Sequence, residues 1–248
     1  MSNSFTECVK NTFVANKNCL ELIEKLDDKV DLLITDPPYN LGLFMHRRNT
    51  NLKKMRENHF SASNWDNLEH EDWIKYVDDF FEKSTKIMQK KGSLIIFMAL
   101  IKVESVIKIA EKYGFYYKTT GVWHKTNPMP RNMNIHFVNS IEGWIYFIYK
   151  GTSGTFNNNA KLMHDYIETS ITPIGEKKFG KHPTQKPVKL IEHFIKTLSN
   201  EGDVVFDPFM GSGTSAVVSY RLKRKFYGIE LEKDYFEITN KRLINEDS

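Results

Sequence analysis

The chain has 248 residues, of which 40% are hydrophobic and 27% are charged, as is typical of a folded globular protein. Its formal net charge of +4 is too small to identify a class of partner by itself. No apolar run approaches the roughly 18 residues that a membrane span needs, and the polar N-terminus lacks the apolar core of a signal peptide, so we expect a cytoplasmic protein without a membrane partner.

The first predicted element is a buried strand, Val30–Thr35, which stops at two prolines. Residues 41–67 are polar and basic, and a loop of this length in a compact domain is usually functional. Apolar residues at helical spacing then predict a helix over Glu69–Lys90, ended by Gly92. A second buried strand follows at Ser93–Ala99.

The middle of the chain is predicted to return along the sheet. A helix over Lys102–Tyr113 precedes two strand-like segments, Phe115–Trp123 and Ile141–Lys150, which could pair antiparallel at one sheet edge. Gly151–Lys181 has no strong periodicity, which indicates a loop or a small irregular module.

The last part of the chain alternates helices and strands. These elements are predicted over Thr184–Leu198 (helix), Asp203–Phe206 (strand), Gly213–Leu222 (helix), Lys225–Glu230 (strand) and Lys233–Leu243 (helix). The alternation predicts an α/β fold with a mostly parallel sheet, as one domain over residues 1–248. Ligands of such sheets bind beyond the carboxyl ends of the strands, so we expect the loops 36–40 and 207–214 to meet there.

The loop Asp36-Pro37-Pro38-Tyr39-Asn40 suits an aromatic amine as substrate. Prolines fix the backbone and remove N–H donors, which leaves carbonyls aimed outwards. Hydrogen bonds from the amine to Asp36 and to the Pro37 carbonyl would direct the nitrogen lone pair at a methyl donor, and Tyr39 could stack on the base. In-line displacement at a sulfonium needs positioning and electrostatics, and no metal. A plain Pro-Pro turn is the alternative.

The glycine-rich loop 207–214 suits a nucleotide-like ligand. Gly211-x-Gly213-x-x-Ala216 fits the dinucleotide pattern, with Glu230 placed for ribose hydroxyls. The pattern fits NAD, FAD or the adenosyl group of S-adenosylmethionine, or a purely structural turn. Asp207 would discourage a pyrophosphate and suit a cationic sulfonium, which favours S-adenosylmethionine.

Together, the two loops resemble the amino-methyltransferases of bacterial DNA. The Asp36-Pro37-Pro38-Tyr39 form is similar to the adenine-N6 members, and the catalytic loop precedes the cofactor loop as in their permuted β group. The resemblance implies a Rossmann-like methyltransferase fold, with a mostly parallel seven-stranded sheet that contains one antiparallel strand. It also implies that residues 41–67 and 130–181 face DNA, the second as a small target-recognition segment.

Other segments carry the resemblance further. Residues 181–187 (KHPTQKP) resemble the segment that lines the methionine end of the cofactor, and 18–20 (NCL) the segment at its adenine, although Asn18 replaces the usual Asp. Residues 123–131 resemble the segment beside the target base, whereas Ser140 and Ile141 depart from the usual His before Glu142. The expected catalytic residues are Asp36, Pro37, Pro38 and Tyr39. The expected cofactor-binding residues are Asn18, Cys19, Asp36, Lys181, His182, Thr184, Gln185, Lys186, Phe206, Asp207, Pro208, Phe209, Gly211, Ser212, Gly213, Thr214 and Glu230.

Basic residues near these motifs suit a phosphate backbone or base edges. The expected DNA-contacting residues are Arg47, Arg48, Lys53, Lys54, Trp123, Lys125, Asn127, Arg131 and Asn132. We therefore expect an S-adenosylmethionine-dependent DNA adenine-N6 methyltransferase that acts on double-stranded DNA. A cognate restriction endonuclease and a homodimer are further expected partners. The alternatives are cytosine-N4 methylation, methylation of RNA or a protein amide, a nicotinamide oxidoreductase, and a catalytically silent DNA-binding protein.

Overall fold

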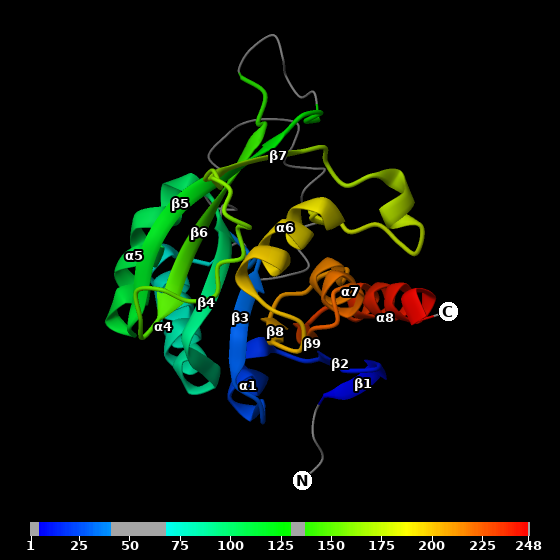
Figure 1. Ribbon diagram of the computed structural model, residues 1–248, viewed down its shortest axis with the longest axis horizontal. Coiled ribbons are helices and arrows are strands. Elements are labelled where there is room, and N and C mark those ends of the chain that lie inside the picture. Colours follow the sequence, from blue (N-terminus) through cyan, green and yellow to red (C-terminus); the bar gives the residue numbers. More distant parts are fainter. Residues whose placement is uncertain (1–4, 41–67, 130–136, 248) are drawn as a thin grey trace.

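The computed structural model describes residues 5–40, 68–129 and 137–247. Its strands are β1 (Thr6–Val9), β2 (Thr12–Asn16), β3 (Val30–Thr35), β4 (Met88–Met98), β5 (Phe115–Lys125), β6 (Ile141–Tyr149), β7 (Tyr166–Thr169), β8 (Val204–Asp207) and β9 (Lys225–Glu230). They form one sheet in the order β1-β2-β9-β8-β3-β4-β6-β5-β7 (Figure 1). The predicted α/β fold with a mostly parallel sheet is therefore confirmed.

The described part of the sheet has two strands more than the seven expected. The short strands β1 and β7 extend its two edges, and β1 and β6 both run antiparallel to their neighbours. Without β1 and β7, the remaining seven strands would contain one antiparallel member, β6. The difference thus lies at the two edges of the sheet.

Helices cover both faces of the sheet. Their bounds are α1 (Cys19–Leu22), α4 (His70–Ile87), α5 (Val103–Lys112), α6 (Val188–Leu198), α7 (Thr214–Arg221) and α8 (Lys233–Asp247), with 3-10 turns η1 (Ile23–Lys25), η3 (Leu100–Lys102) and η4 (Ile174–Lys177). Figure 1 shows α4 and α5 on one side and α6, α7 and α8 on the other. The result is a three-layer α/β/α arrangement.

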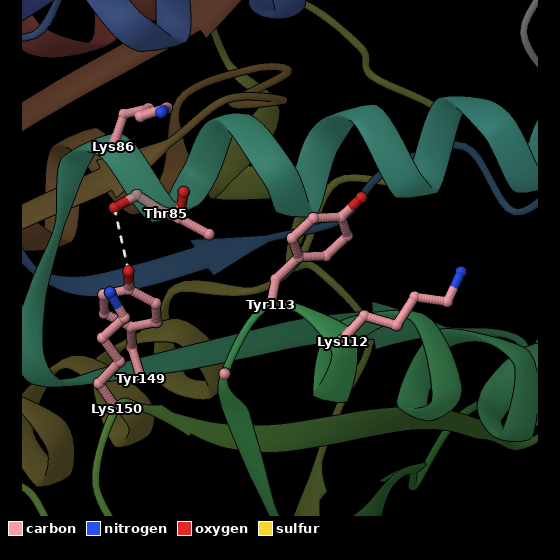
Figure 2. Close-up of a pocket in the computed structure, with 7 residues that line it drawn as sticks. Thr85, Lys86, Lys112, Tyr113, Tyr149 and Lys150 are labelled. Atoms are coloured by element: carbon pink, nitrogen blue, oxygen red, sulfur yellow. Dashed lines mark hydrogen bonds between the residues drawn. The ribbon is translucent and has the colours of Figure 1, made fainter.

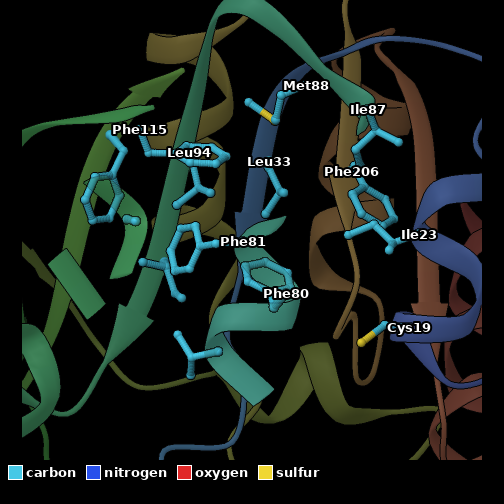
Figure 3. Packing of buried hydrophobic residues seen from close by; sticks show 14 of the residues in the cluster. Cys19, Ile23, Leu33, Phe80, Phe81, Ile87, Met88, Leu94, Phe115 and Phe206 are labelled. Carbon is cyan, nitrogen blue, oxygen red and sulfur yellow. The ribbon is translucent and has the colours of Figure 1, made fainter. Parts of the chain in front are cut away.

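Two apolar cores lie on the two faces of the sheet. Leu33 of β3 faces the core beneath α4, where Phe80 and Phe81 of that helix pack against the sheet (Figure 3). Its neighbours Leu32 and Ile34 face the second core, beneath α6 and α7. This alternation follows from the period of two in a strand, and burial on both faces explains why β3 reads as a continuous apolar run.

The predicted helix Glu69–Lys90 ends three residues early, at Ile87, because β4 already begins at Met88. Pairing with β3 jumps from Met88 to Ser93 while β3 advances only from Val30 to Leu32, so the intervening residues bulge outwards. Gly92 lies in this bulge, where an added Cβ would fall 3.0 Å from the Val30 carbonyl oxygen. Gly92 therefore permits a bulge within a strand, and it does not end the helix.

Other predicted elements are confirmed within a few residues, and some elements were missed. The pairing of β5 with β6 is antiparallel as predicted, but β7 lies outside β5 and is not predicted by the aperiodic segment 151–181. No element was predicted before Val30, where β1, β2 and α1 lie. The loop 41–67 and residues 130–136 fall outside the described residues. Within the described ranges, no helix is both long and apolar enough to cross a membrane.

Candidate active site

The two predicted loops follow neighbouring strands and lie at the same end of these strands, the carboxyl end. β3 and β8 are parallel, with Leu32 opposite Val205 and Leu33 opposite Phe206. Continued by three residues, this register brings Asp36 next to the loop that begins at Asp207. The structure therefore brings together the polar loops that the sequence separates by about 170 positions, as expected for the carboxyl ends of a parallel sheet.

Both carboxylate oxygens of Asp36 are engaged. The hydroxyl of Tyr39 donates to Oδ1 at 2.6 Å, and Nζ of Lys186 donates to Oδ2. The chain leaves the loop at Asn40, whose φ of 51° is left-handed and whose Nδ2 donates to the Leu68 carbonyl at 2.8 Å. Asp36 is thus held at a fixed place, with part of its side chain reaching solvent.

Lys186 belongs to a chain of four charged groups. Its Nζ lies 3.1 Å from Oε2 of Glu142, whose Oε1 is 2.5 Å from Nζ of Lys125. Burial alone would lower the pKa of Lys186, but Asp36 and Glu142 outweigh it and raise that pKa. Burial likewise opposes ionisation of Glu142, but the two lysines lower its pKa below the usual range. Both groups therefore stay charged in this site.

The carboxyl group of Asp207 turns into its own loop. Oδ1 accepts the Phe209 N–H at 3.0 Å, and Oδ2 accepts the Ser215 hydroxyl at 2.6 Å. Burial, reinforced by the nearby charge of Asp36, raises the pKa of Asp207 to about 7 despite these hydrogen bonds. Asp207 thus shapes the loop. The sequence-based preference for a cationic ligand requires Asp207 to be fully ionised, but with this pKa it is only partly ionised near neutral pH.

Glu230 at the end of β9 closes the glycine-rich loop. Its Oε2 accepts the Gly211 N–H at 2.8 Å, and its Oε1 accepts the Glu232 N–H at the same distance. Gly213 has a φ of 74°, and an added Cβ there would lie 2.5 Å from the Thr239 side chain on α8. The loop therefore requires glycine at this position, both for its backbone and for close packing.

Arg242 on α8 forms hydrogen bonds with the same loop. Its Nη1 donates to the Ser212 carbonyl at 2.6 Å and lies 3.1 Å from Oγ1 of Thr214. Oγ1 of Thr214 in turn donates to the Lys186 carbonyl at 3.0 Å. Ser212 and Thr214 are thus fixed by α8 and by the segment that carries Lys186. Because Arg242 lies on a mostly polar helix, no sequence signal marked it as part of the site.

The KHPTQKP segment, residues 181–187, lies beside the glycine-rich loop. Its residues differ in how deeply they are buried. The His182 ring is close enough to Gly211 that an added Cβ would fall 3.2 Å from Nε2, and burial lowers the His182 pKa to about 4. Lys181 and Thr184 are exposed, whereas Gln185 and Lys186 are buried. Among the described residues, buried atoms without a hydrogen-bond partner include Nδ1 of His182 and Oε1 of Gln185. A neutral ring nitrogen and an amide oxygen are available for a polar ligand.

The residues expected at the adenine of a cofactor also lie near the carboxyl ends of the strands. Asn18 caps α1 through a hydrogen bond from the Leu20 N–H to Oδ1 at 3.0 Å, and the preceding Lys17 N–H donates to the Glu230 carbonyl. Cys19 is buried, with Sγ 3.3 Å from the Tyr76 hydroxyl. The structure therefore places Asn18 near Glu230 and gives Cys19 a packing position.

The segment expected beside a target base is partly committed to internal contacts. Trp123 is buried and its Nε1 donates to Thr169 at 2.8 Å. Lys125 pairs with Glu142, and Oδ1 of Asn127 accepts the Ile171 N–H at 2.8 Å. The other expected DNA-contacting residues lie outside the described residues, namely Arg47, Arg48, Lys53, Lys54, Arg131 and Asn132. Within the described ranges, no three His, Cys, Asp or Glu side chains gather as a metal site would require.

A cavity of about 470 Å³ lies at the other ends of the strands, where β4 and β5 begin and β6 ends (Figure 2). It is lined by residues at the end of α4, around Gly114 and at the end of β6. Two of its polar groups are engaged within the protein, since the Tyr149 hydroxyl donates to the Thr85 carbonyl and Lys112 pairs with Asp78. Size alone would suit a ligand, but none of the chemistry-bearing loops reaches it.

Comparisons with known proteins converge on one family. A family model described as DNA methylase matches residues 30–241. The type II methyltransferase M2.LlaDCHI of Lactococcus lactis subsp. cremoris is 32% identical over 94% of this chain and 90% of its own length. M2.DpnII of Streptococcus pneumoniae, also a type II methyltransferase, is 32% identical over 87% and 83%. The crystal structure of an M1.HpyAVI–SAM complex superimposes with a TM-score of 0.70 at 29% identity, covering 93% of this chain and 98% of that one.

Proposed function

Because the chain belongs to the N6/N4 DNA methylase family, we propose that it methylates N6 of an adenine flipped out of double-stranded DNA. The methyl donor is S-adenosylmethionine. One observation carries the choice of reacting group: Asp36, in the form Asp-Pro-Pro-Tyr, directly follows β3 and lies beside the glycine-rich loop that follows β8. The motif order, with Asp36 before that loop, supports assignment to the permuted β group.

The residues around Asp36 fit an amine nucleophile. When bound, S-adenosylmethionine supplies a methyl group on a cationic sulfur, and its C–S bond breaks with the electron pair left on sulfur. Asp36 and the Pro37 carbonyl accept hydrogen bonds from the amine, which keeps its lone pair directed at the methyl carbon. As the N–C bond forms, the nitrogen gives its surplus proton to Asp36.

Tyr39 must change partners for this reaction. In the free protein its hydroxyl occupies Oδ1 of Asp36, the oxygen that the amine needs. An entering base would displace that hydroxyl, and the Tyr39 ring would then stack on the base plane. The resting hydrogen bond thus keeps the ring beside Asp36 before the base arrives.

The loops around Gly211 fit the methyl donor. Glu230 offers carboxylate acceptors to ribose hydroxyls, and the His182 ring, whose Nδ1 has no hydrogen-bond partner, lies beside Gly211, where it could meet the methionine end. Thr184 and Lys181 are exposed and would contribute less. We assign DNA contacts to residues 41–67 and 130–181, and we propose a cognate restriction endonuclease and a homodimer as partners. A DNA substrate would place the enzyme in the cytoplasm.

The test is product analysis after incubation with S-adenosylmethionine and unmethylated genomic DNA. We expect N6-methyladenine in the digested nucleosides, and Asp36→Ala should lower its rate of formation by about 100-fold or more while DNA binding is retained. Asp72→Ala, an exposed position in the first turn of α4, is the matched control. N4-methylcytosine as the product would overturn the base assignment. Neither product, with S-adenosylmethionine binding intact, would point to RNA or a protein amide.

A further inference from the structure

Resting on the proposed function and deepening it, we propose that Lys186 is a positioning residue for Asp36, braced by Glu142 and Lys125. The resemblance of residues 181–187 to a cofactor segment assigns Lys186 to the cofactor. The geometry assigns its ammonium group to the catalytic carboxylate instead.

The ammonium group of Lys186 has little capacity left for another ligand. It donates to Oδ2 of Asp36, lies 3.1 Å from Oε2 of Glu142, and sits 5.1 Å from the centre of the Phe97 ring. Only 7% of its side chain is exposed. One N–H is used by the hydrogen bond to Asp36, and the rest of the ammonium group is enclosed by the Glu142 carboxylate and the Phe97 ring, which interact with it electrostatically.

The brace leaves one oxygen of Asp36 exchangeable. Lys186 holds Oδ2 from the buried side, whereas Oδ1 carries the Tyr39 hydroxyl, which an entering amine can replace. Fixing one oxygen fixes the direction of the other, and a misplacement of about 1 Å can cost on the order of 100-fold in rate. Lys186 therefore sets where the target amine must come to rest.

Glu142 and Lys125 keep the arrangement electrically balanced. The chain Lys125–Glu142–Lys186–Asp36 alternates positive and negative groups and sums to zero. Without Glu142, Lys186 would lose its second anchor, and without Lys186 two carboxylates would share a largely buried site. Removing one partner of a buried pair is costly because the remaining charge is left uncompensated.

Lys186 also links Asp36 to the glycine-rich loop. Its carbonyl accepts the Thr214 hydroxyl at 3.0 Å, at the first residue of α7. One residue thus touches the catalytic carboxylate through its side chain and the cofactor loop through its backbone. The distance between the amine site and the methyl donor would therefore depend on Lys186.

The experiment compares Lys186→Met, Lys186→Arg and Glu142→Gln with Lys189→Met, an exposed lysine on α6 that serves as the control. Each protein is assayed for kcat, for KM of S-adenosylmethionine and of DNA, and for Kd of S-adenosylmethionine without DNA by calorimetry. We expect Lys186→Met to lower kcat about 100-fold with little change in that Kd. Lys186→Arg should recover part of the loss, and Glu142→Gln should lower kcat about tenfold.

Two results would overturn the inference. One is a Kd for S-adenosylmethionine that rises in Lys186→Met as much as kcat/KM falls, which would make Lys186 a cofactor ligand. The other is an unchanged kcat in Lys186→Met or, if that variant does not fold, in Glu142→Gln. If the unmodified protein and Lys189→Met both fail to methylate DNA, the proposed function itself is wrong, and the inference falls with it.

Discussion

At the residue scale, the carboxyl group of Asp207 has an unusual environment for an acid. It is buried beside Asp36, and its pKa is raised to about 7, whereas an ordinary aspartate has a value of 3.8. Between these two values the folded chain holds a proton that the unfolded chain releases. The folded state therefore binds more protons, and the free energy of unfolding must fall as the pH rises through this window.

Asp207→Asn should remove this pH dependence because the amide cannot titrate. Its free energy of unfolding, measured relative to that of the unmodified protein, should increase between about pH 4 and pH 7 and level off above. The increase is on the order of a few kcal/mol, since one pKa unit corresponds to about 1.4 kcal/mol. Urea unfolding of both proteins across this range measures it. A difference that stays constant with pH would mean that Asp207 is already ionised at the acid end.

Some site residues could be predicted from sequence and others could not. Asp36, Gly211 and Gly213 stand in short motifs whose chemistry depends on neighbours along the chain. The roles of Glu142 and Arg242 depend on contacts across the fold, with Lys186 and Ser212 respectively. No local pattern distinguishes such a residue from a charged surface residue, so its place emerges only from the packed structure.

At the scale of elements, α6 begins in an unusual way. Its N-cap is Pro187, whose side chain cannot accept a hydrogen bond. Instead, Oε2 of Glu176, in η4, accepts a hydrogen bond from the Val188 N–H at 3.0 Å. The Glu176 carbonyl also accepts a hydrogen bond from Nε2 of Gln185 at 3.1 Å. A carboxylate at a helix N-terminus also interacts favourably with the helix dipole. Glu176 thus caps a helix from twelve residues away.

Glu176→Ala should therefore destabilise the protein although Glu176 lies outside the cores. Loss of a cap costs about 1 kcal/mol, which in a chain of this size lowers Tm by roughly 2–4 °C. Thermal unfolding is the measurement. Glu237→Ala, at an exposed position on α8, should leave Tm nearly unchanged. Equal shifts in the two variants would show that Glu176 contributes no specific cap.

Elements with strong periodicity were predictable, and those defined by pairing were not. β3 and β9 have the predicted bounds. Each is a short run of mainly apolar residues with polar residues or prolines on either side. The predicted end of α4 was wrong because Met88 continues the apolar pattern of the helix, although its backbone already pairs with Val30 in the sheet. The four residues of β7 show alternating burial only once they lie against β5.

At the scale of the whole molecule, the glycine-rich loop is tied to both α7 and α8, so occupancy of this site should stabilise the entire fold. At about 100 times its Kd, S-adenosylmethionine should add about 2.7 kcal/mol and raise Tm by roughly 5–10 °C. NAD at the same concentration should leave Tm unchanged. A shift with NAD alone would favour a dinucleotide enzyme over a methyltransferase.

The order of the strands has a further consequence, for the timing of synthesis. β3 occupies the centre of the sheet between β4 and β8, but β8 is made about 170 residues later. A nascent chain on the ribosome therefore carries Asp36 directly after a strand with one bare hydrogen-bonding edge until residues 204–207 emerge. The catalytic loop is complete early and stays inert until nearly all of the chain has left the exit tunnel. Chaperones would meet this protein with one edge of its central strand still unpaired.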